Sequence, residues 1–395
     1  MSFRKRAVVV GQSGSNSASS QSTTANKTLP PGLRPSPPDG RLTTSTGTHS
    51  LDSLLAGHAG LALGTSLLIE EHGTTDFAGY LARYFAAEGV VQGHQVHVLG
   101  MHEGWGRELP GLGTGEKSGG SSSKANDEKM KIAWRYERLG EFGSARDRNI
   151  PQPTGTSASS STAVFCHDFD LSKKLVLPSP SPMKFIPIST QPPFEFKDPD
   201  ASVSPFAGFV NHLIAQLSAS PNTIHRAVIP NLLSSALYPP ESSRPEHILQ
   251  FLHALRALLR KYPSQLIAMI TLPATLYPRT TGLTRWMELL SDGVLELSPF
   301  PSTALPAKST PGAATVHEEP PQGMLKIHRL PIFHEKGGGG GEASGFGDDL
   351  AFTLSRRKGL VIKPFSLPPV EGDTEAQQAG LEHEHGKATK VDMEF

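Results

Sequence analysis

The sequence predicts an α/β protein with a mostly parallel central sheet flanked by helices, antiparallel C-terminal strands and long disordered insertions. Three observations support this fold class. Short apolar runs such as SLLIE (66–70) have the composition of buried strands, and segments of helical periodicity lie between them. Strands that alternate with helices usually form a parallel sheet covered on both faces. The last apolar runs, within 324–364, follow one another without a helix, which predicts antiparallel pairing.

The expected elements alternate along the chain. SLLIE and QVHVL (95–99) are expected to be strands, joined by a helix over TDFAGYLARYFAAEG (75–89) with Gly89 at its C-terminal cap. Further strands are expected at AVFCHDF (163–169) and at the start of RAVIPNLL (226–233). The remaining expected helices cover 204–219, 244–262 and 284–290, and the remaining expected strands cover 265–272, 293–297, 324–330 and the two halves of 350–364.

Composition predicts one globular domain within a longer, partly disordered chain. Among 395 residues there are 39 glycines and 34 prolines, and only 37% are hydrophobic, which favours a single core of about 200 to 250 residues. We expect a disordered lead over 1–40, a single domain over 41–365 and a disordered tail over 366–395. Low-complexity insertions are expected within the domain at about 106–128, 150–162 and 335–348.

Charge and cysteine content exclude several functional classes. The 37 basic residues balance the 37 acidic ones, so any contact with nucleic acid has to be local rather than global. The single cysteine, Cys166, cannot form an internal disulfide or a cysteine-based zinc site, and it cannot hold an iron–sulfur cluster. No run approaches the roughly 18 apolar residues of a membrane span, so we expect no membrane partner.

The stretch LLIEEHGTTDF (67–77) predicts a strand, a tight turn and the start of a helix, as in a phosphate-binding loop. A working loop, G-x-x-x-x-G-K-[ST], needs a lysine for the phosphates and a hydroxyl for magnesium. Aligned with that pattern, Gly73 is kept, but Thr75 replaces the second glycine. Asp76 replaces the lysine and Phe77 the hydroxyl. A carboxylate repels phosphate and a phenyl ring cannot bind magnesium, so we expect no bound cofactor.

The second half of an ATPase site is also absent from the sequence. An acidic residue should end a later apolar strand, yet Pro230 and Asn231 occupy that place in RAVIPNLL. We therefore predict that the chain is not an enzyme and has no catalytic or metal-binding residues. The alternative is a divergent ATPase that works alone or at a shared interface, where a partner supplies the lysine and the magnesium ligands.

Two longer segments extend the comparison beyond the turn. TTSTGTHSLDSLLAGHAGLALGTSLLIEE (43–71) combines a Thr–Gly pair, a short helical pattern and a glycine-rich break before the strand. It resembles the start of the RecA-like ATPase core, and SDGVLELSPF (291–300) resembles a late strand of the same fold. The resemblance implies a RecA-like fold with a degenerate nucleotide site.

The chain is similar as a whole to the PAXNEB family, the fourth subunits of the Elongator complex. The similarity extends from the start of the chain to about residue 365, interrupted by the glycine- and serine-rich insertions. The stretches that carry it are MSFRKR (1–6), RPSP (34–37), TTSTG (43–47), LLIEEHGTTDF (67–77), MKIAWRYE (130–137), FCHDFDLS (165–172) and SDGVLEL (291–297). A DNA-repair paralogue of recombinases fits the fold but not the MKIAWRY and FCHDFDL stretches.

The family resemblance implies a function that the residues alone do not. It implies a heterohexameric RecA-like ring with the fifth and sixth Elongator subunits, attached to the catalytic core subunits of the complex. It also implies that the ring binds tRNA, releases it with ATP and supports modification of the wobble uridine (U34). Any ATPase activity then belongs to the assembled ring. A location in cytoplasm and nucleus is expected on the same grounds.

Two basic stretches are candidate RNA or interface sites. In KMKIAWRYERLG (129–140) the helical spacing places Lys131, Arg135 and Arg138 on one face, with Trp134 and Tyr136 available for stacking on a base. Such a face serves equally as a solvated surface over packed apolar residues or as a contact with a ring neighbour.

The second basic stretch is the expected turn of the C-terminal hairpin. Arg356, Arg357 and Lys358 are expected at its tip, either as a simple charged turn or reaching a neighbouring subunit or RNA. Elsewhere, Asp168 and Asp170 of FCHDFDL are expected to be solvated acids at a strand end. The tail LEHEHGK (381–387) is expected to bind metal weakly at most.

Overall fold

Parallel strands make up two thirds of the nine-stranded central sheet. The computed structural model describes residues 29–37, 39–55, 59–113, 164–188, 204–301, 320–331 and 350–365. Within them the strand order is β14-β13-β12-β11-β4-β10-β9-β5-β8, and the six strands from β11 to β8 pair in parallel. These are β4 (Ser66–Glu71), β5 (Gln95–Leu99), β8 (Met183–Ile186), β9 (His225–Ile229), β10 (Leu266–Pro273) and β11 (Gly293–Pro299).

The remaining third of the sheet is antiparallel, as the sequence predicts. It consists of β12 (Gly323–Arg329), β13 (Leu350–Ser355) and β14 (Gly359–Pro364), each paired antiparallel to its neighbour. The α/β class, the mostly parallel sheet and the C-terminal hairpin are therefore confirmed.

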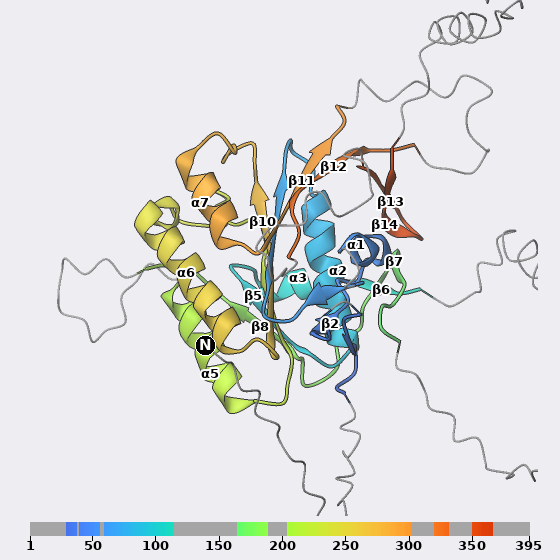
Figure 1. Cartoon of the computed structure of the whole chain (residues 1–395), viewed down its shortest axis with the longest axis horizontal. Helices are drawn as coiled ribbons and strands as arrows, with labels where there is room; N and C mark the ends of the chain where they lie inside the picture. Colours follow the sequence, from blue (N-terminus) through green and yellow to red (C-terminus); the bar gives the residue numbers. More distant parts are fainter. Residues whose placement is uncertain are drawn as a thin grey trace, which may run out of the picture.

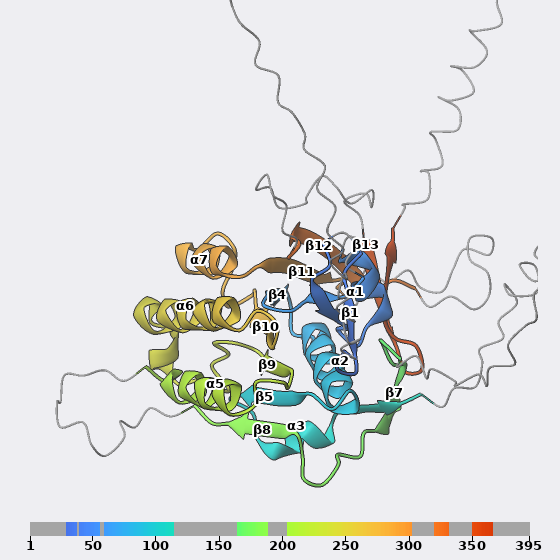
Figure 2. The ribbon, with the colours of Figure 1, turned by 60° about the horizontal axis from the view of Figure 1, so that its bottom comes forward.

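Helices cover both faces of the sheet (Figure 1). One face carries α1 (His49–Leu54), α2 (Phe77–Val91) and α3 (Glu103–Arg107), and the other carries α5 (Ala207–Ala219), α6 (Pro245–Lys261) and α7 (Gly282–Leu290). Figure 2 shows α5, α6 and α7 stacked beside one another, away from α2. No helix within the described ranges is long and apolar enough to cross a bilayer.

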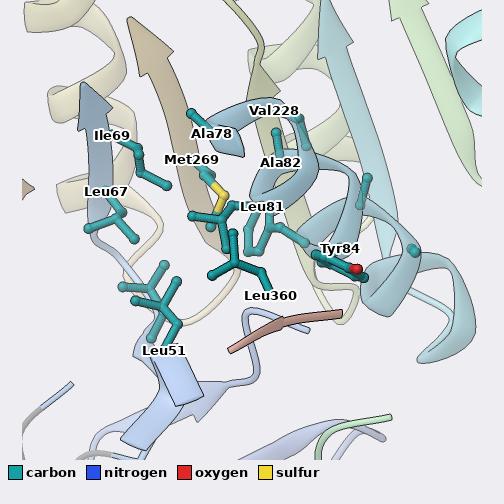
Figure 3. Packing of buried hydrophobic residues seen from close by; sticks show 14 of the residues in the cluster. Leu51, Leu67, Ile69, Ala78, Leu81, Ala82, Tyr84, Val228, Met269 and Leu360 are labelled. Atoms are coloured by element: carbon teal, nitrogen blue, oxygen red, sulfur yellow. The ribbon is translucent and has the colours of Figure 1, made fainter. Parts of the chain in front are cut away.

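The face under α2 is filled by side chains from distant parts of the chain. Ile69 of β4, Met269 of β10, Leu81 of α2 and Leu360 of β14 pack together there (Figure 3). Leu68, between two residues of β4 that face α2, belongs instead to the core under α6, because successive strand residues point to opposite faces. The hairpin strand β14 is thus anchored in the same core as the turn that follows β4.

Small strands complete the fold on the α2 side. They are β1 (Leu33–Pro35), β2 (Leu42–Thr44) and β3 (Leu61–Ala62) in one sheet, and β6 (Pro110–Leu112) with β7 (Phe169–Lys174) in another. β1 lies within the lead predicted to be disordered over 1–40, and the end of α3 and all of β6 lie within the insertion predicted over about 106–128, so these parts of both segments are ordered. The insertions at 150–162 and 335–348 and the tail 366–395 lie outside the described residues.

Two other predictions about elements were wrong. The strand expected at 163–169 begins only at Phe169, and the described residues before it form an irregular segment held by side-chain hydrogen bonds. The helix α2 continues past Gly89 to Val91, and the glycine with positive φ (+77°) that follows it is Gly93. Gly89 is required for packing instead, because a Cβ there would lie 2.6 Å from Cδ of Arg226.

Three histidines form a hydrogen-bonded chain on the α5 side of the sheet. His97 Nε2 lies 3.0 Å from His225 Nδ1, and His97 Nδ1 lies 3.0 Å from His212 Nε2 on α5. His225 Nε2 faces the carbonyl of Ser220 at 3.5 Å and so donates, which makes each ring in turn an acceptor at one nitrogen and a donor at the other. This alternation requires His97 and His225, each of which accepts at Nδ1, to be neutral.

We expect acid to destabilise the fold through this chain. Burial, followed by the charges of His225, His212 and Lys184, lowers the pKa of His97 to about 3 from an ordinary value of 6.5. Below pH 6.5 the unfolded state therefore binds a proton that the folded state does not, so stability falls as the pH drops toward 3. For His97 the loss between pH 7 and pH 5 is about 2 kcal/mol.

Urea unfolding of the wild type and of His97→Gln at the two pH values measures this loss. The variant should lose about 2 kcal/mol less than the wild type on acidification. His253→Gln, on the exposed side of α6, controls for the removal of one histidine. Equal losses in the wild type and in His97→Gln would rule out the histidine chain as the acid-sensitive group.

Candidate functional site

The turn between β4 and α2 lies at the carboxyl edge of the parallel strands. β4 is flanked by β10 and β11, and all three end on the same edge, where open α/β sheets bind their ligands. A helix N-terminus with free backbone N–H groups at such an edge is an anion-binding site. The group that accepts hydrogen bonds from those N–H groups therefore determines whether the site can bind an anion.

The N–H groups at the start of α2 are bound by a carboxylate of the protein itself. Glu71 Oε1 accepts hydrogen bonds from the Phe77 N–H at 2.9 Å and the Thr75 hydroxyl at 2.7 Å. Its Oε2 accepts one from the Ala78 N–H at 2.7 Å. The side chain is buried, and burial raises the pKa of Glu71 although these three hydrogen bonds oppose the shift. Glu71 thus lies where a phosphate would otherwise meet the helix.

The four residues aligned with the phosphate-loop pattern all have other partners. Gly73 has φ of +86° and its N–H donates to the Thr275 hydroxyl at 2.8 Å. Asp76, in the lysine position, pairs with Arg83 at 2.9 Å, and Phe77 packs edge-on against Phe352 of β13 with ring centroids 4.8 Å apart. The antiparallel strand β13 therefore covers the Phe77 side chain at the start of α2.

The segment after β9 carries no carboxylate at this edge. Asn231 adopts a positive φ of 46°, and its N–H donates to the Thr271 hydroxyl at 2.7 Å. The Pro230 carbonyl accepts from the Tyr238 hydroxyl at 3.3 Å. Both predicted positions thus serve the local turn.

An acidic cluster lies on the opposite side of β4 from Glu71. Glu70 is fully buried, and burial raises its pKa to about 8. Ligand atoms of Glu70, Glu296 and His328 lie within 4.8 Å of one another, so these three could hold a metal ion. Arg279 already supplies a positive charge, with Nε 3.4 Å from Glu70, and donates to Nδ1 of His328 at 3.0 Å. That bond places the proton of neutral His328 on Nε2, the nitrogen that faces Glu296.

A buried arginine holds the TTSTG segment (43–47) against α2. Arg226 donates to the carbonyls of Ser45 and Phe85, both at 2.9 Å, and to the Thr44 hydroxyl at 2.7 Å. Its Nε donates to His94 at 3.0 Å. Burial lowers the pKa of Arg226 to about 10, so the guanidinium remains charged at neutral pH. TTSTG therefore has a structural role here.

A second buried charge, Glu88 of α2, fixes the FCHDF segment. Its carboxylate accepts from the His167 N–H at 3.1 Å and lies 3.0 Å from His167 Nδ1. Gln92 donates to Glu88 at 2.8 Å and to the carbonyl of Val164 at 2.8 Å. Burial raises the pKa of the Cys166 thiol, which disfavours the thiolate that a nucleophile needs.

The tip of the C-terminal hairpin rests on β7. Arg356, Arg357 and Lys358 form the turn between β13 and β14, and all three are exposed. The Arg356 carbonyl accepts from the Leu171 N–H at 2.8 Å, which fixes the tip beside the acids of FCHDFDL. Asp168 lies 3.0 Å from His49, and Asp170 accepts from the Ser172 N–H at 2.8 Å.

A pocket of about 200 Å³ opens beneath this tip. It is lined by residues from the end of TTSTG and the start of α1, from the FCHDFDL stretch and from the C-terminal hairpin, together with Tyr84 of α2. The lining residues are Gly47, Thr48, His49, Ser50, Tyr84, His167, Asp168, Phe169, Lys358, Gly359, Leu360 and Val361.

The other predicted basic stretch cannot be placed. Lys131, Trp134, Arg135, Tyr136 and Arg138 lie outside the described residues, so their RNA and interface roles stay predictions.

The sequence analysis missed Glu71, Glu88 and Arg226. Their position inside apolar strands and helices could have indicated buried hydrogen-bonding roles, because charged residues are almost never buried without partners.

Together, the sheet and the turn after β4 define an α/β protein whose central strand–turn–helix unit is closed by an internal carboxylate. A family model for the PAXNEB protein matches residues 26–395, and the chain belongs to this family.

Curated relatives from distant organisms agree with the family match. Elongator complex protein 4 of Schizosaccharomyces pombe is 33% identical over 361 residues, covering 87% of this chain and 90% of the relative. The proteins of the same name from Saccharomyces cerevisiae and Homo sapiens are 27% and 29% identical, covering 91% and 89% of this chain and 81% and 82% of the relatives. A crystal structure of a KaiC-like protein from Pyrococcus horikoshii matches 82% of this chain and 99% of its own, with 14% identity and a TM-score of 0.39.

Proposed function

We propose that this protein is a non-catalytic subunit of the Elongator complex. In this proposal it forms a RecA-like heterohexameric ring with the fifth and sixth subunits. The ring attaches to the catalytic core subunits, binds tRNA and supports modification of its wobble uridine, in cytoplasm and nucleus. Family membership supports the assignment to Elongator.

One structural observation supports the non-catalytic role. The N–H groups that would bind a phosphate are bound by Glu71, and the lysine and hydroxyl positions hold Asp76 and Phe77. A phosphate entering this turn would have to displace one buried carboxylate and approach a second. Both conditions oppose nucleotide binding, so the degenerate phosphate loop is proposed to serve the fold only.

Co-expression with the candidate fifth and sixth subunits tests this proposal. We expect a stable heterohexamer by mass-resolved purification, no ATP hydrolysis by this chain alone, and tRNA binding that weakens as salt is raised. The salt dependence is expected because the contacts are with phosphates. A stable monomer that hydrolyses ATP by itself would overturn the non-catalytic assignment and favour the divergent ATPase.

A further inference from the structure

The outward side of helix α7 exposes two large apolar side chains. At the end of the layer formed by α5, α6 and α7 (Figure 2), this helix packs Met287 and Leu290 into the core. Trp286 is 56% exposed and Leu289 is 54% exposed. Residues three apart lie on the same side of a helix, so these two side chains form one patch, here called the α7 face. Single exposed apolar residues are common, but a tryptophan beside a leucine is typical of a surface that contacts another segment.

Arginine side chains flank the α7 face. Arg256 of α6 donates to the Leu289 carbonyl at 3.1 Å. On α7 itself, Arg285 pairs with Glu288 at 3.0 Å, but the arginine side chain is 58% exposed and the glutamate only 7%. The positive charges therefore meet solvent beside the apolar side chains, while the carboxylate lies beneath them. This arrangement is complementary to a segment that carries both apolar and acidic residues.

The chain contains such a segment after the last residue that the structure describes. VDMEF (391–395) has apolar residues at its first, third and fifth positions and acids between them. In an extended segment alternate side chains point to opposite sides, so the apolar ones can lie on one surface while the acids stay in water. The whole stretch 366–395 carries seven acidic residues against two lysines, and the family match includes it. Its composition is thus the complement of the α7 face and its arginines.

The strand pairing brings the start of this stretch close to α7. Pro364 of β14 is linked through β13 and β12 to Leu297 of β11, a row of three strand spacings or about 15 Å. Three antiparallel pairings make β14 run opposite to β11, so β14 ends toward the edge where β11 begins and α7 ends. The 25 residues of 366–390 span about 25 to 30 Å as a flexible linker. Residues 391–395 can therefore reach the α7 face of their own chain.

We propose that residues 391–395 bind the α7 face within the same chain. Their apolar side chains cover Trp286 and Leu289, and their acids remain solvated beside Arg256 and Arg285. Because the segment is tethered, its local concentration at the face is in the millimolar range, so a contact that is weak between separate molecules is sufficient. The proposal does not depend on the proposed function, because one chain supplies both partners.

Cross-linking of the full chain between two introduced cysteines tests this contact. In a Cys166→Ser background, Lys390→Cys is combined with Gly282→Cys, where an added Cβ meets nothing within 4 Å and which lies one turn before Trp286. Lys390→Cys with Gly208→Cys is the matched control, because Gly208 is an exposed glycine in the first turn of α5 with the same open space. A short bis-maleimide should link the Gly282 pair within one chain about tenfold faster than the Gly208 pair.

Variants of the two surfaces show whether the apolar contact is responsible. Phe395→Ser in the segment, or Trp286→Ser in the α7 face, should reduce the rate of the Gly282 pair to that of the Gly208 pair. Ile214→Ser, which removes an exposed apolar side chain from α5, is the matched control and should leave the rate unchanged. Raising the salt concentration should slow the Gly282 pair but not the Gly208 pair, because salt screens the attraction between acids and arginines.

Three results would overturn the proposal. Equal rates for the two cysteine pairs mean that the segment does not bind the α7 face. Links that form mainly between two chains mean that the segment of a second copy occupies the face. If Gly282→Cys is shielded from maleimide in the co-purified assembly, and remains shielded with Phe395→Ser, another subunit covers the face instead.

Discussion

Replacing Arg226 with methionine is expected to lower the free energy of unfolding by about 4 kcal/mol. The guanidinium is fully buried and makes four hydrogen bonds, two to the carbonyls of Ser45 and Phe85. Methionine fills much of the space but leaves those acceptors without donors. It also removes the positive charge that stabilises the buried carboxylates of Glu88 and Asp52.

Urea unfolding of the wild type, Arg226→Met and Arg256→Met measures this effect. Arg256 is a suitable control because its guanidinium is at the surface, where it donates to the Leu289 carbonyl, and its loss should cost under about 1 kcal/mol. The double variant Arg226→Met with Glu88→Gln should lose less than the two single losses added together, because each residue compensates the other. Similar losses in Arg226→Met and Arg256→Met would show that the buried network contributes little.

Removing the Glu71 carboxylate is expected to have the second largest effect. Glu71→Ala leaves the N–H groups of Phe77 and Ala78 and the Thr75 hydroxyl without their acceptor, which should cost about 3 kcal/mol. The vacated space is the size of a carboxylate and is lined by donors. Formate should therefore raise the melting temperature of Glu71→Ala more than that of the wild type.

Thermal unfolding in formate and in chloride at equal ionic strength separates this rescue from a general salt effect. Glu103→Ala, which removes an exposed acid from the first turn of α3, should match the wild type in both salts. If formate stabilises the wild type as much as Glu71→Ala, the carboxylate is not occupying an anion site. Under the proposed non-catalytic role, neither the wild type nor Glu71→Ala should hydrolyse ATP, because Asp76 and Phe77 are present in both.

The local pattern of the sequence was sufficient to predict most of the elements. Apolar runs predicted five of the six parallel strands, all except β8. The amphipathic face of α6 is buried through Ile248, Phe251 and Leu255, as the helical spacing of its apolar residues indicates. These predictions succeed because a strand or helix that faces a core needs its apolar residues at fixed intervals.

The errors occurred where a distant residue decides the local structure. Gly89 has the position of a helix cap along the chain, but Arg226 of β9 occupies the space beside it and the helix continues. FCHDF has the composition of a strand, but Glu88 binds the His167 N–H and keeps the segment irregular. Neither partner is near in sequence, so no pattern of spacing could reveal the contact.

Only part of the candidate site could be predicted from the sequence, because one of its main contacts forms only when the chain folds. The turn, and the prediction that a phosphate-binding lysine and hydroxyl are missing from it, follow from Gly73, Asp76 and Phe77 alone. The group that replaces the phosphate, Glu71, is only two residues before Gly73, yet its role depends on the chain folding back so that the side chain meets the start of α2.

The internal carboxylate also bears on how a ring containing this chain would move. A turn that binds a nucleotide changes its conformation as the nucleotide binds, reacts and dissociates. The turn after β4 is closed by Glu71, a residue of the chain itself, so no nucleotide has to bind for the turn to be formed. In the proposed ring this subunit then acts as a rigid spacer. Conformational changes driven by ATP would start in the adjoining subunits, and this chain would move with them as a rigid body.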